Sequence, residues 1–222
     1  AKALMASPAS PTSIETVDDK VLGLAQQDFV WDSVAEFFPA TSGAPRADNH
    51  QDQADDQAED DTAVATHTET SIRGINLIEF NADDPEALKA RINDFTRHLE
   101  SDSSVERLGY TLAEGHEQIK RVYAMRKRAV GLLGNVQGEK RPIPFVEDTA
   151  VPPEHLADYI AEFRAALDAH GLTYGMFGHV DAGVLHVRPA IDMKDPAQEA
   201  LIRQISDEVA ELTHKYHGLL WG

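Results

Sequence analysis

The last third of the chain carries a regular order of secondary-structure signals, and this order constrains the fold more than any other feature. Residues 142–150 are predicted to form a strand, and Pro152-Pro153-Glu154 begins a helix with an apolar stripe at helical spacing. Two short strands follow at 173–179 and 184–189, and Asp195-Pro196 begins another helix. The order strand, helix, strand, strand, helix is half of a ferredoxin-like α+β sandwich.

Residues 74–133 supply the signals for a second, similar half. Residues 74–80 are predicted to be a strand, and Asp84-Pro85 is typical of a helix N-terminus. A weak strand is predicted at 106–112, and a helix at 116–133. We therefore predict an α+β fold, a duplicated ferredoxin-like sandwich in which helices cover an antiparallel sheet.

The acidic residues concentrate in one segment that suggests how the chain is divided. Residues 41–71 have low complexity and little to bury, so we predict a disordered acidic insertion there. Residues 1–40 would begin the folded domain as a truncated first half, with a strand at 13–17, and residues 72–222 would continue it. The middle of the insertion holds seven acids and no Lys or Arg: Asp48, Asp52, Asp55, Asp56, Glu59, Asp60 and Asp61.

Composition excludes several classes of function. The 222 residues include 20 Lys plus Arg against 38 Asp plus Glu, and a net charge of −18 argues against nucleic acid or an anionic membrane surface as partner. The chain has no Cys, so it offers no disulfide, no Fe–S ligand and no thiol nucleophile. No apolar run approaches the roughly 20 residues of a transmembrane helix. These features indicate a soluble intracellular protein.

Two histidines stand out as candidate metal ligands. If the strands at 173–179 and 184–189 pair around a turn at Asp181–Gly183, His179 and His186 come close together. Two neutral imidazoles form a partial site for zinc or a similar divalent ion, although a catalytic site normally has a third protein ligand. The alternative is that both are strand histidines that hydrogen-bond to the backbone or to water.

Arg126 is a candidate anion-binding residue. It falls on the apolar side of the predicted helix 116–133, between Val122 and Val130 at helical spacing. An arginine there must pair with an anion or extend to solvent, and its planar guanidinium suits a carboxylate. An internal ion pair and a substrate carboxylate both remain open. Glu147-Asp148 at a strand end could act as acid–base groups or as charges near a helix N-terminus.

Several sequence runs together resemble one family. They are Thr12–Leu22, Tyr123–Gly134, Pro142–Pro153 and Tyr174–Pro189, the last containing both histidines. These runs closely resemble the C-terminal cap domain of the FAD-linked oxidases, the group of D-lactate, glycolate and D-2-hydroxyglutarate dehydrogenases. The resemblance is greatest to the bacterial type in which the FAD-linked oxidase is fused to a cysteine-rich Fe–S domain. It covers nearly the whole chain except the acidic segment.

The resemblance implies roles for the candidate residues. Arg126 matches the arginine that binds the substrate carboxylate, and His179 and His186 match two ligands of a divalent metal, usually zinc. The third ligand of that family belongs to a Glu-His-Gly motif, which would follow Gly222 together with the proposed catalytic base. This chain departs from the family at Val184, where relatives commonly carry an asparagine before the second histidine.

The function that the resemblance implies belongs to a longer parent protein. We expect the chain to be the substrate-binding cap of an FAD-dependent 2-hydroxy acid dehydrogenase of the D-2-hydroxyglutarate or D-lactate type, inactive on its own. Its partners would be a small 2-hydroxy acid and the flavin and Fe–S domains of the same parent, with FAD held mainly outside this chain. The location would be cytoplasmic, with membrane association only through an electron acceptor. The alternative is a non-catalytic ferredoxin-like module that binds a small molecule or a metal.

Overall fold

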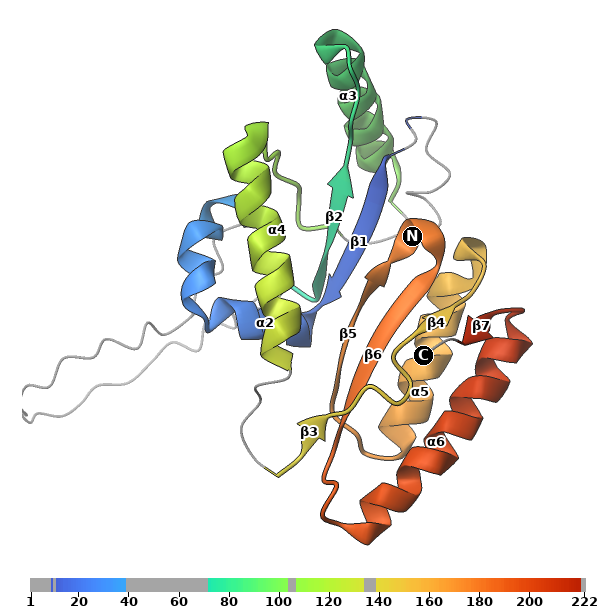
Figure 1. Cartoon of the computed structure of the whole chain (residues 1–222). Helices are drawn as coiled ribbons and strands as arrows, with labels where there is room; N and C mark the ends of the chain where they lie inside the picture. Colours follow the sequence, from blue (N-terminus) through green and yellow to red (C-terminus); the bar gives the residue numbers. More distant parts are fainter. Residues whose placement is uncertain (1–8, 10, 39–71, 104–106, 134–138, 221–222) are drawn as a thin grey trace, which may run out of the picture.

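The chain folds around one antiparallel sheet with helices on both faces (Figure 1). The computed structural model describes residues 9, 11–38, 72–103, 107–133 and 139–220, and the predicted insertion at 41–71 lies outside them. The strand order is β2-β1-β5-β6-β4-β7, and β3 pairs with β6. The strands are β1 (Ser13–Asp18), β2 (Gly74–Glu79), β3 (Arg141–Pro142), β4 (Thr149–Ala150), β5 (Tyr174–His179), β6 (Val184–Ile191) and β7 (Leu219–Leu220). The helices are α2 (Asp19–Gln26), α3 (Pro85–Ser101), α4 (Gly115–Leu132), α5 (Leu156–Ala169) and α6 (Pro196–Lys215).

The C-terminal elements form a complete ferredoxin-like unit. Along the chain they follow the order β4, α5, β5, β6, α6, β7, and in the sheet the strands lie in the order β5-β6-β4-β7. The two helices α5 and α6 pack on one face of this sheet. Their shared core with the strands includes fully buried Tyr159, Phe163, Leu185, Ile205 and Val209.

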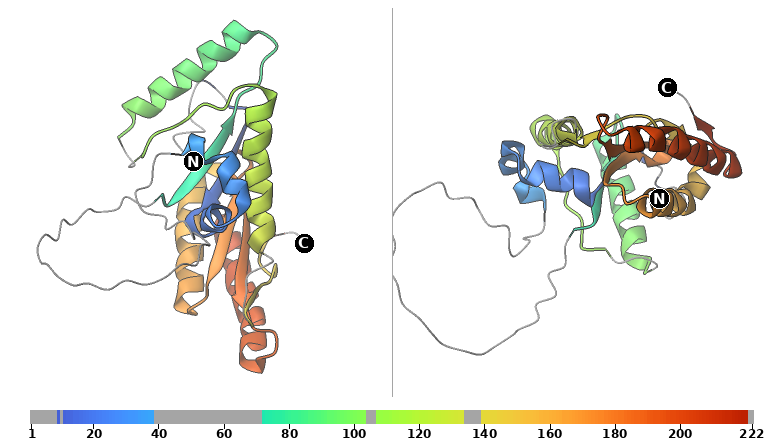
Figure 2. Two further views of the ribbon diagram at one scale, coloured as in Figure 1. Left: turned by 90° about the vertical axis from the view of Figure 1, so that its left-hand side faces the viewer. Right: turned by 90° about the horizontal axis from the view of Figure 1, so that it is seen from below.

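The N-terminal elements extend the same sheet and cover its other face. Strand β1 pairs with both β2 and β5, and so joins the two parts of the molecule. Helices α2 and α4 pack together against this face, whereas α3 projects beyond the sheet at the end of β2 (Figure 2). Their core includes Val17, Val21, Met125, Ala129 and Phe177. The predicted antiparallel α+β fold is confirmed.

Local capping explains where the helices begin. The side chain of Asp84 accepts a hydrogen bond from the Glu86 amide at 3.1 Å, and Asp195 caps α6 in the same way. Both are followed by proline at the first helical position, whose missing N–H would have had no partner there. Gly171 follows α5 with a φ of 64°, a left-handed conformation that favours glycine.

Asp18 joins both parts of the molecule at the start of α2. One carboxylate oxygen accepts from the Val21 amide at 2.9 Å, and the other accepts from the Met176 amide at 3.0 Å. Arg164 on α5 lies 3.5 Å from the same carboxylate. Burial raises the pKa of Asp18 from its ordinary value of 3.8, although these hydrogen bonds and Arg164 act in the opposite direction.

Two strand predictions were wrong. Residues 142–150 form only β3 and β4 at their ends, because Pro142 and Pro144 have no amide hydrogen with which to continue a ladder. Residues 107–112, the described part of the predicted strand at 106–112, form no strand. Their apolar side chains are exposed, so the alternation that predicted a strand does not mark a buried face there: Leu108, Tyr110 and Leu112.

Candidate functional site

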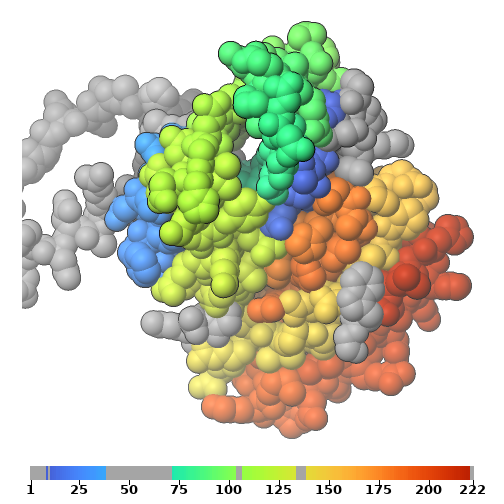
Figure 3. Space-filling model, turned by 45° about the horizontal axis from the view of Figure 1, so that its top comes forward, coloured from blue at the N-terminus to red at the C-terminus, as the bar shows by residue number. Residues whose placement is uncertain are grey.

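One face of the sheet carries a line of charged and imidazole side chains beyond the core formed by α2 and α4. Strand alternation places Glu15, Phe177, His179, His186 and Arg188 on this face. The pairing of β1 with β5 sets Glu15 directly opposite His179, and the pairing of β5 with β6 sets Phe177 opposite His186. In the space-filling view the surface of β5 and β6 is bordered by α4 and by the segment 139–150 (Figure 3).

The two predicted metal ligands lie side by side. The ring centroids of His179 and His186 are 5.4 Å apart, and the rings are nearly perpendicular. His186 also stacks on Phe177 with a centroid distance of 4.9 Å. The turn between the strands holds this arrangement, because Gly183 has a φ of 69° and an added Cβ there would overlap the Val151 carbonyl oxygen.

Both imidazoles have a carboxylate beside the same ring nitrogen. Nδ1 of His186 lies 2.7 Å from Oδ1 of Asp148, and Nδ1 of His179 lies 3.3 Å from Oε1 of Glu15. A carboxylate can only accept, so each contact favours the tautomer with its proton on Nδ1 and a lone pair on Nε2. A carboxylate at the other ring nitrogen orients a histidine and makes it a better metal ligand.

Arg126 extends from α4 to the same face. It forms an ion pair with Glu15 through Nε and Oε2, and both side chains are largely buried, 20% and 14% exposed. Its guanidinium carbon lies 5.7 Å from the centroid of the Phe177 ring. Glu15 therefore contacts both Arg126 and His179, and this one carboxylate links two residues that the sequence predicted separately. The terminal nitrogens of Arg126 make no hydrogen bond with the described part of the chain.

Sequence reasoning missed a second arginine on this face. Arg188 donates a hydrogen bond from one terminal nitrogen to Oε1 of Glu147 at 2.6 Å, and its guanidinium carbon lies 6.0 Å from the Phe177 centroid. Its position two residues after His186 on a strand was the available signal, because alternation puts both on one face. Glu147 and Asp148 thus bind side chains of β6 and do not cap a helix.

The polar line continues to the far side of Arg126. The hydroxyl of Tyr123 donates to Oε2 of Glu79 at 2.9 Å, and Ser13 donates to the same oxygen at 3.2 Å. Burial and the adjacent Glu79 carboxylate raise the pKa of Tyr123, so its hydroxyl stays protonated at neutral pH. One oxygen of Glu79 therefore accepts from two hydroxyl donors.

The donor set on this face is suited to a divalent metal. Two imidazole Nε2 atoms with carboxylates at their Nδ1 atoms are typical zinc ligands. A second grouping is also possible, because ligand atoms of Glu147, Asp148 and His186 all lie within 4.8 Å of one another. In that grouping Asp148 would bind the metal together with His186 and give up its contact with Nδ1 of that ring, so the contact present in the structure favours the first arrangement.

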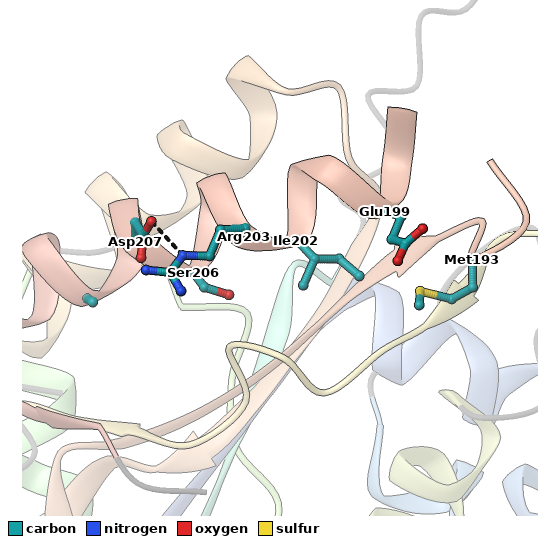
Figure 4. Close-up of a pocket in the computed structure, with 7 residues that line it drawn as sticks. Met193, Glu199, Ile202, Arg203, Ser206 and Asp207 are labelled. Atoms are coloured by element: carbon teal, nitrogen blue, oxygen red, sulfur yellow. Dashed lines mark hydrogen bonds and ion pairs between the residues drawn. The ribbon is translucent and has the colours of Figure 1, made fainter. Parts of the chain in front are cut away.

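One surface hollow lies away from this face. It is lined by α6 side chains and Met193, and it contains an ion pair between Arg203 and Asp207 with an Nε–Oδ2 distance of 2.9 Å (Figure 4). None of its lining residues belongs to the face with the two histidines. Among the described residues no helix combines the length and apolar character needed to cross a membrane.

The family described as FAD linked oxidases, C-terminal domain, matches residues 1–222, and the chain belongs to it. Among its curated relatives is the D-2-hydroxyglutarate dehydrogenase of Pseudomonas putida, 60% identical over 222 residues. The D-2-hydroxyglutarate dehydrogenase of Escherichia coli K12 is 50% identical over 217 residues, 96% of this chain.

The match covers only a small part of each relative. The chain spans 19% of the length of both dehydrogenases. A solved structure of alkyldihydroxyacetonephosphate synthase aligns with 99% of this chain and 37% of its own length, with a TM-score of 0.46 and 10% identity. The family assignment rests on the sequence match alone.

Proposed function

We propose that this chain is the substrate-binding cap of a longer FAD-dependent dehydrogenase that oxidises a D-2-hydroxy acid of the D-2-hydroxyglutarate type. The observation that carries the proposal is the convergence of Arg126, His179 and His186 on one sheet face around Glu15 and Phe177. A 2-hydroxy acid presents a carboxylate next to a hydroxyl. An arginine beside a pair of metal-binding imidazoles matches both groups.

Arg126 would bind the carboxylate that neighbours the hydroxyl. Its terminal nitrogens have no hydrogen-bond partner among the described residues, so they can form the two parallel bonds that carboxylates prefer. Glu15 holds the guanidinium from its Nε side and partly neutralises its charge. This support fixes the side chain before the substrate arrives, which reduces the entropy lost on binding.

His179 and His186 would hold a divalent metal through Nε2. Glu15 and Asp148 would fix the orientation of the two rings through their contacts with Nδ1. When bound, the metal would polarise the substrate hydroxyl, and the flavin of the whole protein would accept the hydride. The part of this chain is to orient the α-carbon and to keep the imidazoles in the metal-binding tautomer. We expect the remaining metal ligand and the base that takes the hydroxyl proton to come from outside residues 1–222.

The rest of the parent protein is also part of the proposal. The family is that of FAD-linked oxidases, and we propose that FAD binds mainly to another domain of the parent. An Fe–S domain that carries the electrons away, zinc as the metal, and a cytoplasmic location remain predictions from the resemblance. We also propose that residues 41–71 are an acidic insertion in the cap.

The proposal can be tested in the full-length protein that carries this chain. D-2-hydroxyglutarate oxidation would be followed with a dye as electron acceptor in the wild type and in His179→Gln and His186→Gln. We expect both variants to retain bound FAD but to lose at least about 100-fold in kcat, because metal-bound groups contribute several kcal/mol to such transition states. His214→Gln, at the end of α6, is the matched control and should keep wild-type kcat. Wild-type rates in both site variants would contradict the proposal and favour a non-catalytic module.

A further inference from the structure

Arg188 has an incomplete set of partners for a buried cation. One terminal nitrogen bonds to Glu147, and the two side chains are 28% and 15% exposed. Its Nε is buried and has no hydrogen-bond partner among the described residues. Almost all buried donors in folded proteins are satisfied, so such an atom needs an explanation. A ligand oxygen would provide one.

Arg188 shares its surroundings with Arg126. Both guanidinium carbons lie within 6.0 Å of the centroid of the Phe177 ring, so their separation cannot exceed twice that distance. The ring of His186 stacks on Phe177, and His179 adjoins His186. Two cations and the imidazole of His186 therefore lie around one aromatic ring on this face of the sheet, and His179 adjoins His186.

The unused donors of the two arginines suit a diacid. Each arginine has one carboxylate of the protein, Glu15 or Glu147, and each retains donors that no described residue uses. A monocarboxylate needs only one of these cations. A five-carbon diacid with a 2-hydroxyl group has one carboxylate for each arginine and a hydroxyl for the imidazole pair.

We infer that Arg188 binds the second carboxylate of a dicarboxylic 2-hydroxy acid, and that it selects such diacids over monocarboxylic 2-hydroxy acids. The inference rests on the proposed function, because it presupposes that Arg126 binds the first carboxylate. Arg188 then acts as a specificity-determining residue: its planar guanidinium pairs with a carboxylate, whereas a methyl group at the same place leaves its remaining N–H donors without a partner. Glu147 accepts a hydrogen bond from one side of the Arg188 guanidinium and so helps to fix it, as Glu15 does for Arg126.

The test compares two substrates of equal chain length in the full-length protein. D-2-hydroxyglutarate carries the second carboxylate, and D-2-hydroxyvalerate ends in a methyl group. We expect Arg188→Gln to lower kcat/KM for D-2-hydroxyglutarate about 100-fold and to change that for D-2-hydroxyvalerate less than about threefold. Arg203→Gln, which removes an exposed arginine from α6, should change neither value.

The outcomes separate this inference from the function on which it rests. An equal loss with both substrates, or no loss with either, would show that Arg188 only supports the structure and would overturn the inference. Arg188→Lys keeps the positive charge and tests whether the loss in Arg188→Gln comes only from misfolding. It should retain part of the diacid activity and leave monoacid activity unchanged. If Arg126→Gln loses both substrates while Arg188→Gln loses neither, the proposed function stands and the inference fails. If the wild type oxidises neither substrate, both fail.

Discussion

Asp148 and His186 are joined by a contact of 2.7 Å between a carboxylate oxygen and Nδ1 of the imidazole. Asp148 directly precedes β4, and His186 lies on β6, its neighbour in the sheet. Because a carboxylate accepts only, the contact directs the proton to Nδ1 and frees Nε2 for a metal. Glu15 lies in the equivalent place beside His179, at 3.3 Å. Each imidazole of the proposed metal site is therefore held by a carboxylate before any metal binds.

Replacing Asp148 should weaken metal binding without removing a ligand. Asp148→Asn leaves His186 in place but no longer fixes its tautomer. Loss of a carboxylate that supports a metal-binding histidine typically costs about 10- to 100-fold in metal affinity. The measurement is calorimetric titration of the metal-free, full-length protein with Zn²⁺. Asp207→Asn, which alters an exposed carboxylate on α6, serves as the control. Equal affinity in Asp148→Asn and wild type would exclude a positioning role for Asp148.

Glu15 and Arg126 should be energetically coupled. Both side chains are largely buried, so removing one partner leaves the other poorly compensated. We expect a double-mutant cycle of Glu15→Gln and Arg126→Gln, measured by urea unfolding of the chain, to give a coupling free energy of about 1 kcal/mol. The exposed pair of Arg203 and Asp207 should give no more than about 0.5 kcal/mol. A smaller coupling at Glu15 and Arg126 than at this control pair would contradict the prediction.

The left-handed turn at Gly183 should tolerate no side chain. An alanine there would adopt an unfavourable φ of 69° and overlap the Val151 carbonyl oxygen, so we expect Gly183→Ala to lower the free energy of unfolding by about 2 kcal/mol or more. Gly23 in α2 has open space around its Cβ position. Gly23→Ala should therefore raise stability by about 0.5–1 kcal/mol. Chemical denaturation of both variants makes the comparison, and equal effects would refute it.

The buried carboxylate of Asp18 should give stability a distinct pH dependence. Burial raises its pKa above 3.8 in the folded state, so the folded chain binds a proton more tightly than the unfolded chain. The free energy of unfolding contributed by Asp18 therefore rises as the pH falls through the raised pKa, and the gain is complete below 3.8.

Asp18→Asn removes this titration and serves as the reference. It should also be less stable at neutral pH, because an amide offers one acceptor where the carboxylate accepts from both Val21 and Met176. In urea unfolding, the stability advantage of the wild type over Asp18→Asn should grow between pH 7 and pH 4. An advantage that shrinks over this range would show that the ion pair with Arg164 outweighs burial.

The elements that position the site were predictable because local chemistry specifies them. Asp195-Pro196 is a capping signal within four residues, and alternation along 184–189 distinguishes the two faces of β6 without reference to any other element. The position of Arg126 between Val122 and Val130 likewise follows from helical periodicity. These signals were sufficient to select Arg126, His179 and His186.

The partners of those residues could not be predicted in the same way. Glu15 reaches Arg126 and His179 only because β1 pairs with β5, and nothing near Glu15 in the sequence records that pairing. The contacts of Glu147 and Asp148 depend on how the proline-interrupted segment before β4 crosses β6. The error at 107–112 has the same origin, because alternation alone does not reveal whether a partner strand exists.

The most direct test of the account compares two arginines on α4 in the full-length protein. Arg126 faces the imidazole pair through Glu15, whereas Arg128 pairs with Asp28 at 3.0 Å on the other side of the helix and serves as the matched control. We predict that Arg126→Gln lowers kcat/KM for D-2-hydroxyglutarate about 100-fold with bound FAD unchanged, and that Arg128→Gln stays within about threefold of the wild type. A wild-type kcat/KM in Arg126→Gln would contradict the claim that this face binds the substrate.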